Sequence, residues 1–200
     1  MRFTKVGLTG GIASGKSSVA GLWHARGAAV IDSDRLAHRT LEPGTPTHAE
    51  IVREFGTEIL NADGSIHRPT LGGIVFGNER RRQVLNQIVH PVVRQMWGDE
   101  LAAVQRAGRT AVAVVAIPLL FEVGVEEEFD CVVVVACSEQ TQLARLAAKG
   151  LDAAQARARI ASQLPPQAKM DRGDFVVWND GSLSVLERQA AMIWSKIKEN

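Results

Sequence analysis

The residues best suited to chemistry stand near the start of the chain, in the run Gly10-Gly11-Ile12-Ala13-Ser14-Gly15-Lys16-Ser17. This run matches the pattern G-x-x-x-x-G-K-[ST], in which glycines let backbone N–H groups turn inward around a phosphate. The lysine can neutralise the β- and γ-phosphates, and the hydroxyl that follows it can bind Mg²⁺. The pattern predicts an ATP or GTP site with the cofactor-binding residues Gly11, Ile12, Ala13, Ser14, Gly15, Lys16, Ser17 and Ser18.

The sequence on either side of this loop supports the same interpretation. A β-prone run occupies residues 3–8, and apolar residues at helical spacing follow from Val19 onward. A strand, a glycine loop and a helix are the setting that a phosphate-binding loop requires, because the start of the helix adds the positive end of its dipole. The alternative is a glycine-rich turn from strand to helix with an exposed lysine.

Two carboxylates follow the second β-prone run, residues 28–31. Asp32 and Asp34 should project from the carboxyl edge of the sheet, where open α/β folds bind ligands. In an extended chain, residues two apart point to the same side. Asp32 is therefore the candidate catalytic base for an attacking hydroxyl and, with Ser17, a candidate ligand of hydrated Mg²⁺. The alternative for Asp34 is an N-cap of a helix that begins at Arg35.

Basic side chains gather in the last third of the chain. Phosphoryl transfer spreads negative charge over the moving group, and a lid with arginines can neutralise that charge while excluding water. We expect two or three of these side chains to contact phosphate, with Arg145, Arg157 and Arg159 favoured; the alternative is a set of solvated faces. The candidates are Arg145, Lys149, Arg157, Arg159, Lys169 and Arg172.

The chemistry requires a scaffold, and the apolar pattern predicts one. β-prone runs occupy residues 3–8, 28–31, 110–117, 131–136 and 175–178, and the third and fourth are almost continuously apolar. Strands covered on both faces have this pattern, so the fold class is α/β: a parallel P-loop NTPase-type sheet flanked by helices. Neither an Asn-Lys-x-Asp nor an Asp-x-x-Gly string, which a GTPase would need, occurs in the chain. A small-molecule kinase is therefore favoured.

Two excursions from the sheet define the predicted domains. Residues 1–34, 110–145 and 174–200 form the core, residues 35–109 a helical insert, and residues 146–173 a small helical lid. Within the insert we expect one helix over residues 79–89, another over 92–107, and a turn at Gly72-Gly73. The exposed, basic character of the lid suggests that it moves.

Composition limits the possible partners. The chain has 200 residues, 46% of them hydrophobic, and a net charge of +1, so no bulk charge favours nucleic acid or an anionic membrane. No charged segment followed by an apolar one opens the chain, and its apolar runs are shorter than the roughly 20 residues of a membrane helix. We expect a cytoplasmic protein. Cys131 and Cys137, six residues apart in one strand, should be buried and free of a disulfide.

Six segments together resemble one family, dephospho-CoA kinase, in order and across residues 3–197. The glycine loop is shared with many other families, but the ordered set is specific. The segments are Gly7 through Ser17, Ile31-Asp32-Ser33-Asp34, His90-Pro91, Pro118-Leu119-Leu120-Phe121-Glu122, Arg159-Ile160-Ala161-Ser162-Gln163 and Asn179-Asp180-Gly181.

The resemblance implies that ATP is the phosphate donor with Mg²⁺, and that dephospho-coenzyme A is the acceptor. By this resemblance, Asp32 would deprotonate the ribose 3′-hydroxyl, and Arg159 and Asn179 would complete the ATP site. Lys16, from the loop pattern, and Arg145, from its charge, are the other two predicted catalytic residues. The family's acceptor pocket corresponds to His90, Pro118, Leu119, Leu120, Phe121 and Glu122. Asp32 and Asp34 at the sheet edge are also predicted to bind the acceptor.

Some of these residues have plainer alternatives. His90 could simply end a helix and pack inside, and Leu119, Leu120 and Phe121 could be core residues instead of an apolar wall beside the ligand. Ala116 stands where many family members carry an acid, which puts magnesium binding from that strand in doubt.

Two further departures from the family pattern concern Lys149 and Trp178. Lys149 replaces a usual arginine and lacks the forked donor geometry of a guanidinium. Trp178 replaces a more usual acidic residue and could lie against adenine or merely pack.

Three functions remain open at this stage. They are a dephospho-coenzyme A kinase, a kinase for another nucleoside or nucleotide, and a non-catalytic regulator that binds nucleotide. Intact Lys16, Ser17 and Asp32 count against the regulator. The protein is expected to be a monomer or a small homo-oligomer.

Overall fold

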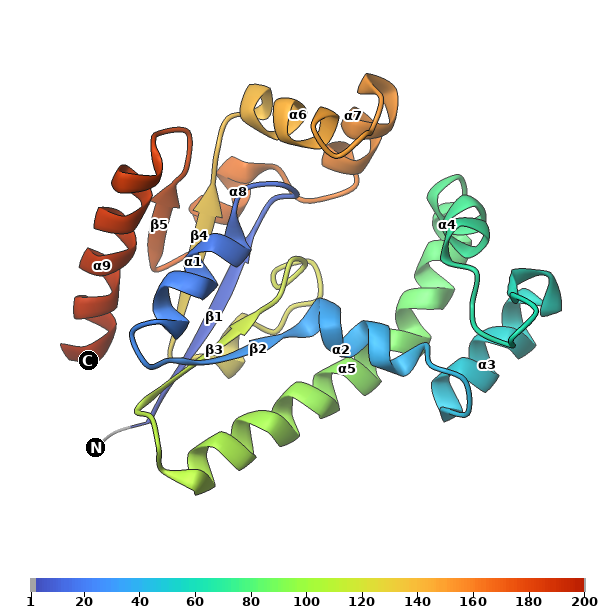
Figure 1. Cartoon of the computed structure of the whole chain (residues 1–200), viewed down its shortest axis with the longest axis horizontal. Coiled ribbons are helices and arrows are strands. Elements are labelled where there is room, and N and C mark those ends of the chain that lie inside the picture. Colours follow the sequence, from blue (N-terminus) through green and yellow to red (C-terminus); the bar gives the residue numbers. More distant parts are fainter. Residues whose placement is uncertain (1–2, 200) are drawn as a thin grey trace. The chain divides into compact units, whose positions relative to one another are not determined.

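The structure, a computed structural model, describes residues 3–199, without the side chain of Phe76. Five parallel strands form one sheet in the order β2-β3-β1-β4-β5. All five coincide with the predicted runs to within a few residues, and the predicted parallel α/β class is confirmed (Figure 1). The strands are β1 (Thr4–Gly10), β2 (Ala29–Asp32), β3 (Val112–Ala116), β4 (Cys131–Ala136) and β5 (Phe175–Trp178).

The sheet is apolar on both faces. Every residue of β3 and of β4 is buried, as the continuous apolar runs predicted. On one face, helices α1 (Lys16–His24) and α9 (Leu183–Glu199) pack side by side over the strands (Figure 1). Trp23 of α1 is fully buried there, and its indole Nε1 donates to the Ala190 carbonyl of α9 at 2.9 Å.

Three helices follow β4. They are α6 (Glu139–Ala147), α7 (Ala153–Ala161) and α8 (Pro166–Met170), and a short 3₁₀ helix, η2 (Glu126–Glu128), precedes β4. Side-chain caps start two of them, because Ser138 and Asp152 each accept an N–H bond from the third residue beyond. Helix α8 packs on β4.

The chain divides into two compact units, Met1–Asp32 with Leu101–Asn200, and Ser33–Glu100. The second unit has its own apolar core, which includes Ile51, Phe55 and Leu71. Its elements are α2 (Ser33–Thr40), α3 (Pro46–Phe55), η1 (Thr57–Ile59), α4 (Arg68–Phe76) and most of α5 (Glu79–Ala107). The further division into core, insert and lid stays a prediction.

Two expectations for this second unit are wrong. Helix α5 runs unbroken from Glu79 to Ala107 with Pro91 inside it, where we expected two helices separated at His90-Pro91. One proline removes a single hydrogen bond, and the other bonds of a 29-residue helix can outweigh that loss. Gly72 and Gly73 form no turn and lie within α4, since glycine only weakens a helix.

The two cysteines are buried and free, as predicted. Burial, and secondarily the carboxylates of Asp174 and Asp130, raise the pKa of the Cys131 thiol to about 11. Burial also raises the pKa of the Cys137 thiol, so neither cysteine shows the character of a reactive thiolate. Among residues 3–199, no helix is both long and apolar enough to cross a bilayer.

Candidate active site

The glycine loop begins where β1 ends and closes where α1 starts. Ala13 (φ 58°) and Gly15 (φ 99°) both adopt left-handed backbone angles, and Ala13 is the one non-glycine residue among residues 3–199 with a positive φ. Such a conformation costs a β-carbon residue of order 1 kcal/mol or more and is found where the surroundings enforce it. The loop at Ala13 is therefore held in shape by its neighbours.

Side chains of α6 bond the loop carbonyls from behind. The Nε2 group of Gln142 donates to the Ile12 carbonyl at 2.7 Å. Arg145 donates from Nη1 to the Ala13 carbonyl at 3.0 Å and to the Ser14 carbonyl at 3.2 Å. Because these three carbonyls face protein donors, the loop is free to present N–H groups on its other side.

Asn179, after β5, completes this support. The residue is buried, and its Nδ2 group donates to the Ser14 carbonyl at 2.7 Å while its own carbonyl accepts from Arg145 Nη2 at 2.9 Å. A β-carbon on Gly15 would collide with that same Nδ2 group, which explains why glycine stands there. Asn179 thus lies behind the loop; its predicted place in the ATP site stays a prediction.

The inner side of the loop offers donors. Among residues 3–199, the N–H groups of Ala13 and Gly15 have no protein acceptor. The Gly15 carbonyl accepts from the N–H groups of Ser18 and Val19, so α1 starts immediately after the loop and its dipole points at it. Unpaired N–H groups at a helix N-terminus form an anion site, and an exposed Ser17 and a half-exposed Lys16 lie in its first turn.

Asp32 is the last residue of β2, and its side chain is exposed. It pairs in register with Ala116 of β3, which itself pairs with Leu8 of β1. The carboxylate therefore stands at the same edge of the sheet as the glycine loop, as predicted.

Asp34 differs from our expectation. Helix α2 begins at Ser33, so Asp34 lies in its first turn, in the second unit, instead of continuing the strand beside Asp32. It is also not the predicted N-cap, because the helix already includes it. The acidic side chain still suits the positive helix start.

The segment after β3 is mostly core. Leu120 is fully buried and Phe121 is 4% exposed, and a β-carbon on Gly7 would approach Leu120 Cδ1 to 2.7 Å. Pro118 and Leu119 are half-buried. Of the three residues of the predicted apolar wall, only Leu119 presents much surface.

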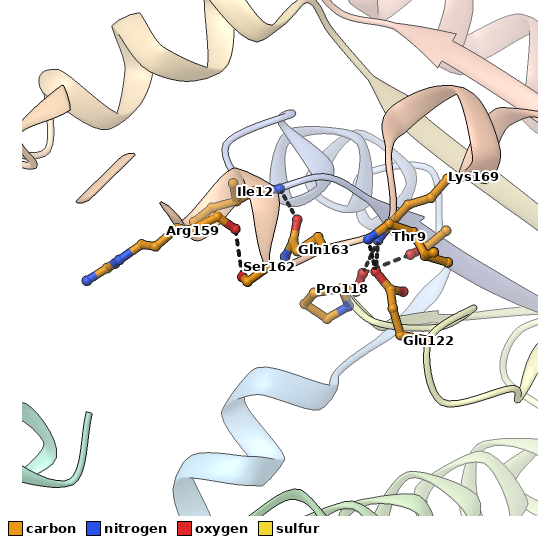
Figure 2. Close-up of polar contacts among 9 residues, drawn as sticks. Thr9, Ile12, Pro118, Glu122, Arg159, Ser162, Gln163 and Lys169 are labelled. Atoms are coloured by element: carbon orange, nitrogen blue, oxygen red, sulfur yellow. Dashed lines mark hydrogen bonds and ion pairs between the residues drawn. The ribbon is translucent and has the colours of Figure 1, made fainter. Parts of the chain in front are cut away.

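The prediction of an exposed, basic lid is wrong at Lys169. It is 0% exposed, and its Nζ lies 2.8 Å from Glu122 Oε1 and donates to the Pro118 carbonyl at 2.9 Å (Figure 2). The long aliphatic stem of lysine allows such burial when the ammonium finds acceptors. Because the Lys169 ammonium is bonded to Glu122 and Pro118, it is not available to a phosphate.

Arg172 is also engaged elsewhere. It pairs with Glu126, and its guanidinium lies 4.5 Å from the centre of the Phe121 ring. Arg157 and Lys149 are exposed, and Arg159 is half-exposed on α7. Contact between these three side chains and phosphate stays a prediction.

Two glutamines form hydrogen bonds to the loop that the sequence reasoning did not predict. Gln142 is 2% exposed, and Gln163, after α7, accepts from the Ile12 N–H at 2.8 Å (Figure 2). A polar residue at a buried position of α6 is a signal, but only the folded chain shows which loop it reaches.

A magnesium ion would find few protein ligands here. Ser17 offers a hydroxyl and Asp32 a carboxylate, and Ala116 offers no ligand from β3. No group of three or more His, Cys, Asp or Glu side chains suited to a metal occurs among residues 3–199. This donor set fits Mg²⁺, which keeps several waters and binds mainly through phosphates and one or two protein oxygens.

His90 lies within α5 in the second unit and is half-buried. Burial lowers the pKa of its imidazole below the usual value. A lowered pKa favours the neutral imidazole, which can donate a hydrogen bond from one nitrogen and accept one at the other. The interpretation that His90 ends a helix is wrong, because α5 continues through it.

Known proteins provide the remaining observation. A sequence model of the family described as dephospho-CoA kinase matches residues 4–184. The chain is 45% identical over 194 residues to a dephospho-CoA kinase of Anaeromyxobacter dehalogenans, covering 96% of this chain and 92% of that one. A solved protein from Thermus thermophilus has 33% identity and a TM-score of 0.83, with 98% of both chains covered. A solved dephospho-CoA kinase from Campylobacter jejuni has 26% identity and a TM-score of 0.71, with 98% and 97% covered. With its phosphate loop intact and its whole fold shared, this chain belongs to the dephospho-CoA kinase family.

Proposed function

We propose that this protein transfers the γ-phosphoryl group of ATP to the ribose 3′-hydroxyl of dephospho-coenzyme A, giving ADP and coenzyme A. Family membership supports the choice of donor and acceptor. The observation that carries the proposal is the bonding pattern of the glycine loop. Its carbonyls accept hydrogen bonds from Gln142, Arg145 and Asn179, and the N–H groups of Ala13 and Gly15 remain available for phosphate.

On the donor side, the loop N–H groups and the start of α1 bind the β- and γ-phosphates. Lys16 supplies a positive charge to the oxygens of the β- and γ-phosphates, on either side of the phosphorus–oxygen bond that breaks. Ser17, together with Asp32 at the same edge of the sheet, would hold Mg²⁺. When bound, the ion neutralises phosphate charge. Phosphoryl transfer depends mostly on such positioning and electrostatic stabilisation.

On the acceptor side, the oxygen of the ribose 3′-hydroxyl forms a bond to the γ-phosphorus, and Asp32 accepts the proton of that hydroxyl. The bond from that phosphorus to the bridging oxygen of ADP breaks, and ADP leaves. The half-buried Pro118 and Leu119 contact the acceptor in this proposal, and Asp34 and His90 of the second unit contribute to its recognition.

Arg145 acts mainly through the loop. Its guanidinium bonds the Ala13, Ser14 and Asn179 carbonyls, so it fixes the loop and places a positive charge behind the phosphates. Arg157 and Arg159 on α7 are the candidates for direct phosphate contact, and the lid over residues 146–173 excludes water from the transfer. We place the protein in the cytoplasm as a monomer or small homo-oligomer that binds neither nucleic acid nor membrane.

The acceptor can be identified by rate comparison. We expect ADP release from Mg-ATP to depend on dephospho-coenzyme A, with adenosine and AMP supporting less than about 1% of that rate, since an acceptor that lacks the rest of the substrate forfeits the binding energy used for positioning. A coupled assay for ADP measures all three acceptors. Faster turnover with AMP or adenosine would contradict the proposed acceptor, and nucleotide binding without any transfer would contradict catalysis.

A further inference from the structure

A short segment, residues 163–169, lies against two different parts of the first unit, and we call it the anchor segment. At its start, Gln163 Oε1 accepts from the N–H of Ile12 in the glycine loop at 2.8 Å. One residue later, the Leu164 N–H donates to Glu122 Oε1 at 3.0 Å. Figure 2 shows Gln163 reaching Ile12 beside the cluster at Glu122.

The other end of the anchor segment is fixed by a buried ion pair. Lys169 pairs with Glu122 at 2.8 Å and donates to the Pro118 carbonyl at 2.9 Å. That carbonyl also accepts from Thr9 Oγ1 at 3.2 Å (Figure 2). Since Lys169 is 0% exposed, breaking the pair would strand a buried charge, so this end is firmly held.

The hydrogen bond from Ile12 to Gln163 lies directly before Ala13, the loop residue with a left-handed φ. The Ile12 N–H belongs to the peptide before Ile12, and the Ile12 carbonyl, bonded to Gln142 Nε2 at 2.7 Å, belongs to the peptide after it. Two side-chain amides therefore hold the two peptide planes that flank Ile12. The second plane is shared with Ala13, whose left-handed φ of 58° needs such support.

We infer that Gln163 is a positioning residue for ATP binding: from a segment anchored beside Pro118 and Glu122, it sets the Ile12 peptide and so keeps the Ala13 N–H aimed at phosphate. The bond takes the N–H of Ile12 itself out of phosphate binding. Because the same segment holds Glu122 and Pro118, it also joins the ATP loop to the segment after β3 that we propose contacts the acceptor. The choice of ATP as ligand rests on the proposed function.

The test compares two glutamines of the anchor segment. Gln163→Met keeps the length of the side chain and removes the strong acceptor. Gln167→Met makes the same change on α8, where the Gln167 side-chain amide donates to Asp171 Oδ1 at 2.7 Å on the exposed surface. Calorimetric titration with Mg-ATP, without acceptor, measures the Kd of each variant, and amide hydrogen exchange reports on the loop.

We expect Gln163→Met to weaken Mg-ATP binding by about 3- to 10-fold, the value of one hydrogen bond, and to speed exchange of the Ile12 amide. Gln167→Met should bind within twofold of the parent. In the kinase assay the same loss should raise the KM for ATP and leave kcat near its parental value.

Three results would overturn the inference: unchanged binding in Gln163→Met, equal losses in both variants, or tighter binding, which would mean that Gln163 competes with phosphate for the Ile12 N–H. These outcomes are separate from the proposed function. A protein that binds ATP as expected but fails to phosphorylate dephospho-coenzyme A would contradict that function and leave the role of Gln163 intact.

Discussion

Replacing Asp32 with asparagine is expected to lower kcat for phosphoryl transfer by about 10²- to 10⁴-fold, the usual contribution of a general base. The amide cannot take the proton of the attacking hydroxyl. It keeps the size of the side chain, so β2 and its pairing with β3 should be unaffected. Initial rates at saturating Mg-ATP and dephospho-coenzyme A measure the loss. The Kd for ATP measured without Mg²⁺ should change less than about threefold, because the loop N–H groups that we propose bind phosphate are untouched.

The matched control is Asp63→Asn, the same change in the second unit. Asp63 is exposed, and hydrogen bonds from Ser65 hold the pKa of its carboxyl below the usual value. Asparagine can keep one acceptor oxygen there, so activity should stay within twofold of the parent. If Asp32→Asn retained more than a tenth of the parental kcat, Asp32 would not be the base.

The second large effect is expected at Gly10. A β-carbon there would collide with the backbone carbonyl of Val135 in β4 and lie 2.7 Å from Ser14 Oγ, at a φ of 153° that other residues rarely adopt. Gly10 pairs with Val135 in the sheet, so neither strand can move away cheaply. Gly10→Ala should destabilise the fold by about 2–5 kcal/mol and abolish measurable ATP binding, because backbone strain and overpacking each cost about 1–3 kcal/mol.

Gly21→Ala provides the comparison within the next element. Gly21 lies inside α1, and a β-carbon there would meet nothing within 4 Å. Alanine is the better helix former, so this variant should gain about 0.5–1 kcal/mol. Denaturant unfolding of both variants measures the contrast; equal stability of the two would show that the close approach of β1 to β4 is not what requires glycine at Gly10.

The sheet and the glycine loop were predictable because their signals are local. A continuous apolar run predicts a doubly covered strand, and the positions of Lys16 and Ser17 follow from the loop pattern itself. The place of Asp32 at the carboxyl edge of the sheet was predictable because this residue directly follows a β-prone run. Its role as catalytic base stays a prediction.

The contacts that the sequence did not predict join residues that are distant in sequence. Lys169 reads as a surface cation until Glu122 and Pro118, about fifty residues earlier, are seen to surround it. Gln163 and Ile12 are 151 residues apart. The helix break expected at Pro91 failed for a different reason: the cost of one proline is local, whereas α5 is stabilised along its whole length.

The most direct test of the account is to identify the phosphorylated product. Purified protein, Mg-ATP and dephospho-coenzyme A are incubated to completion, and phosphorus NMR with mass spectrometry locates the new group. We predict one phosphomonoester per acceptor, on the ribose 3′-oxygen, with one ADP formed for each. Phosphate released into solution, or attached to any other oxygen, would contradict the assignment of the acceptor hydroxyl to the site beside Asp32.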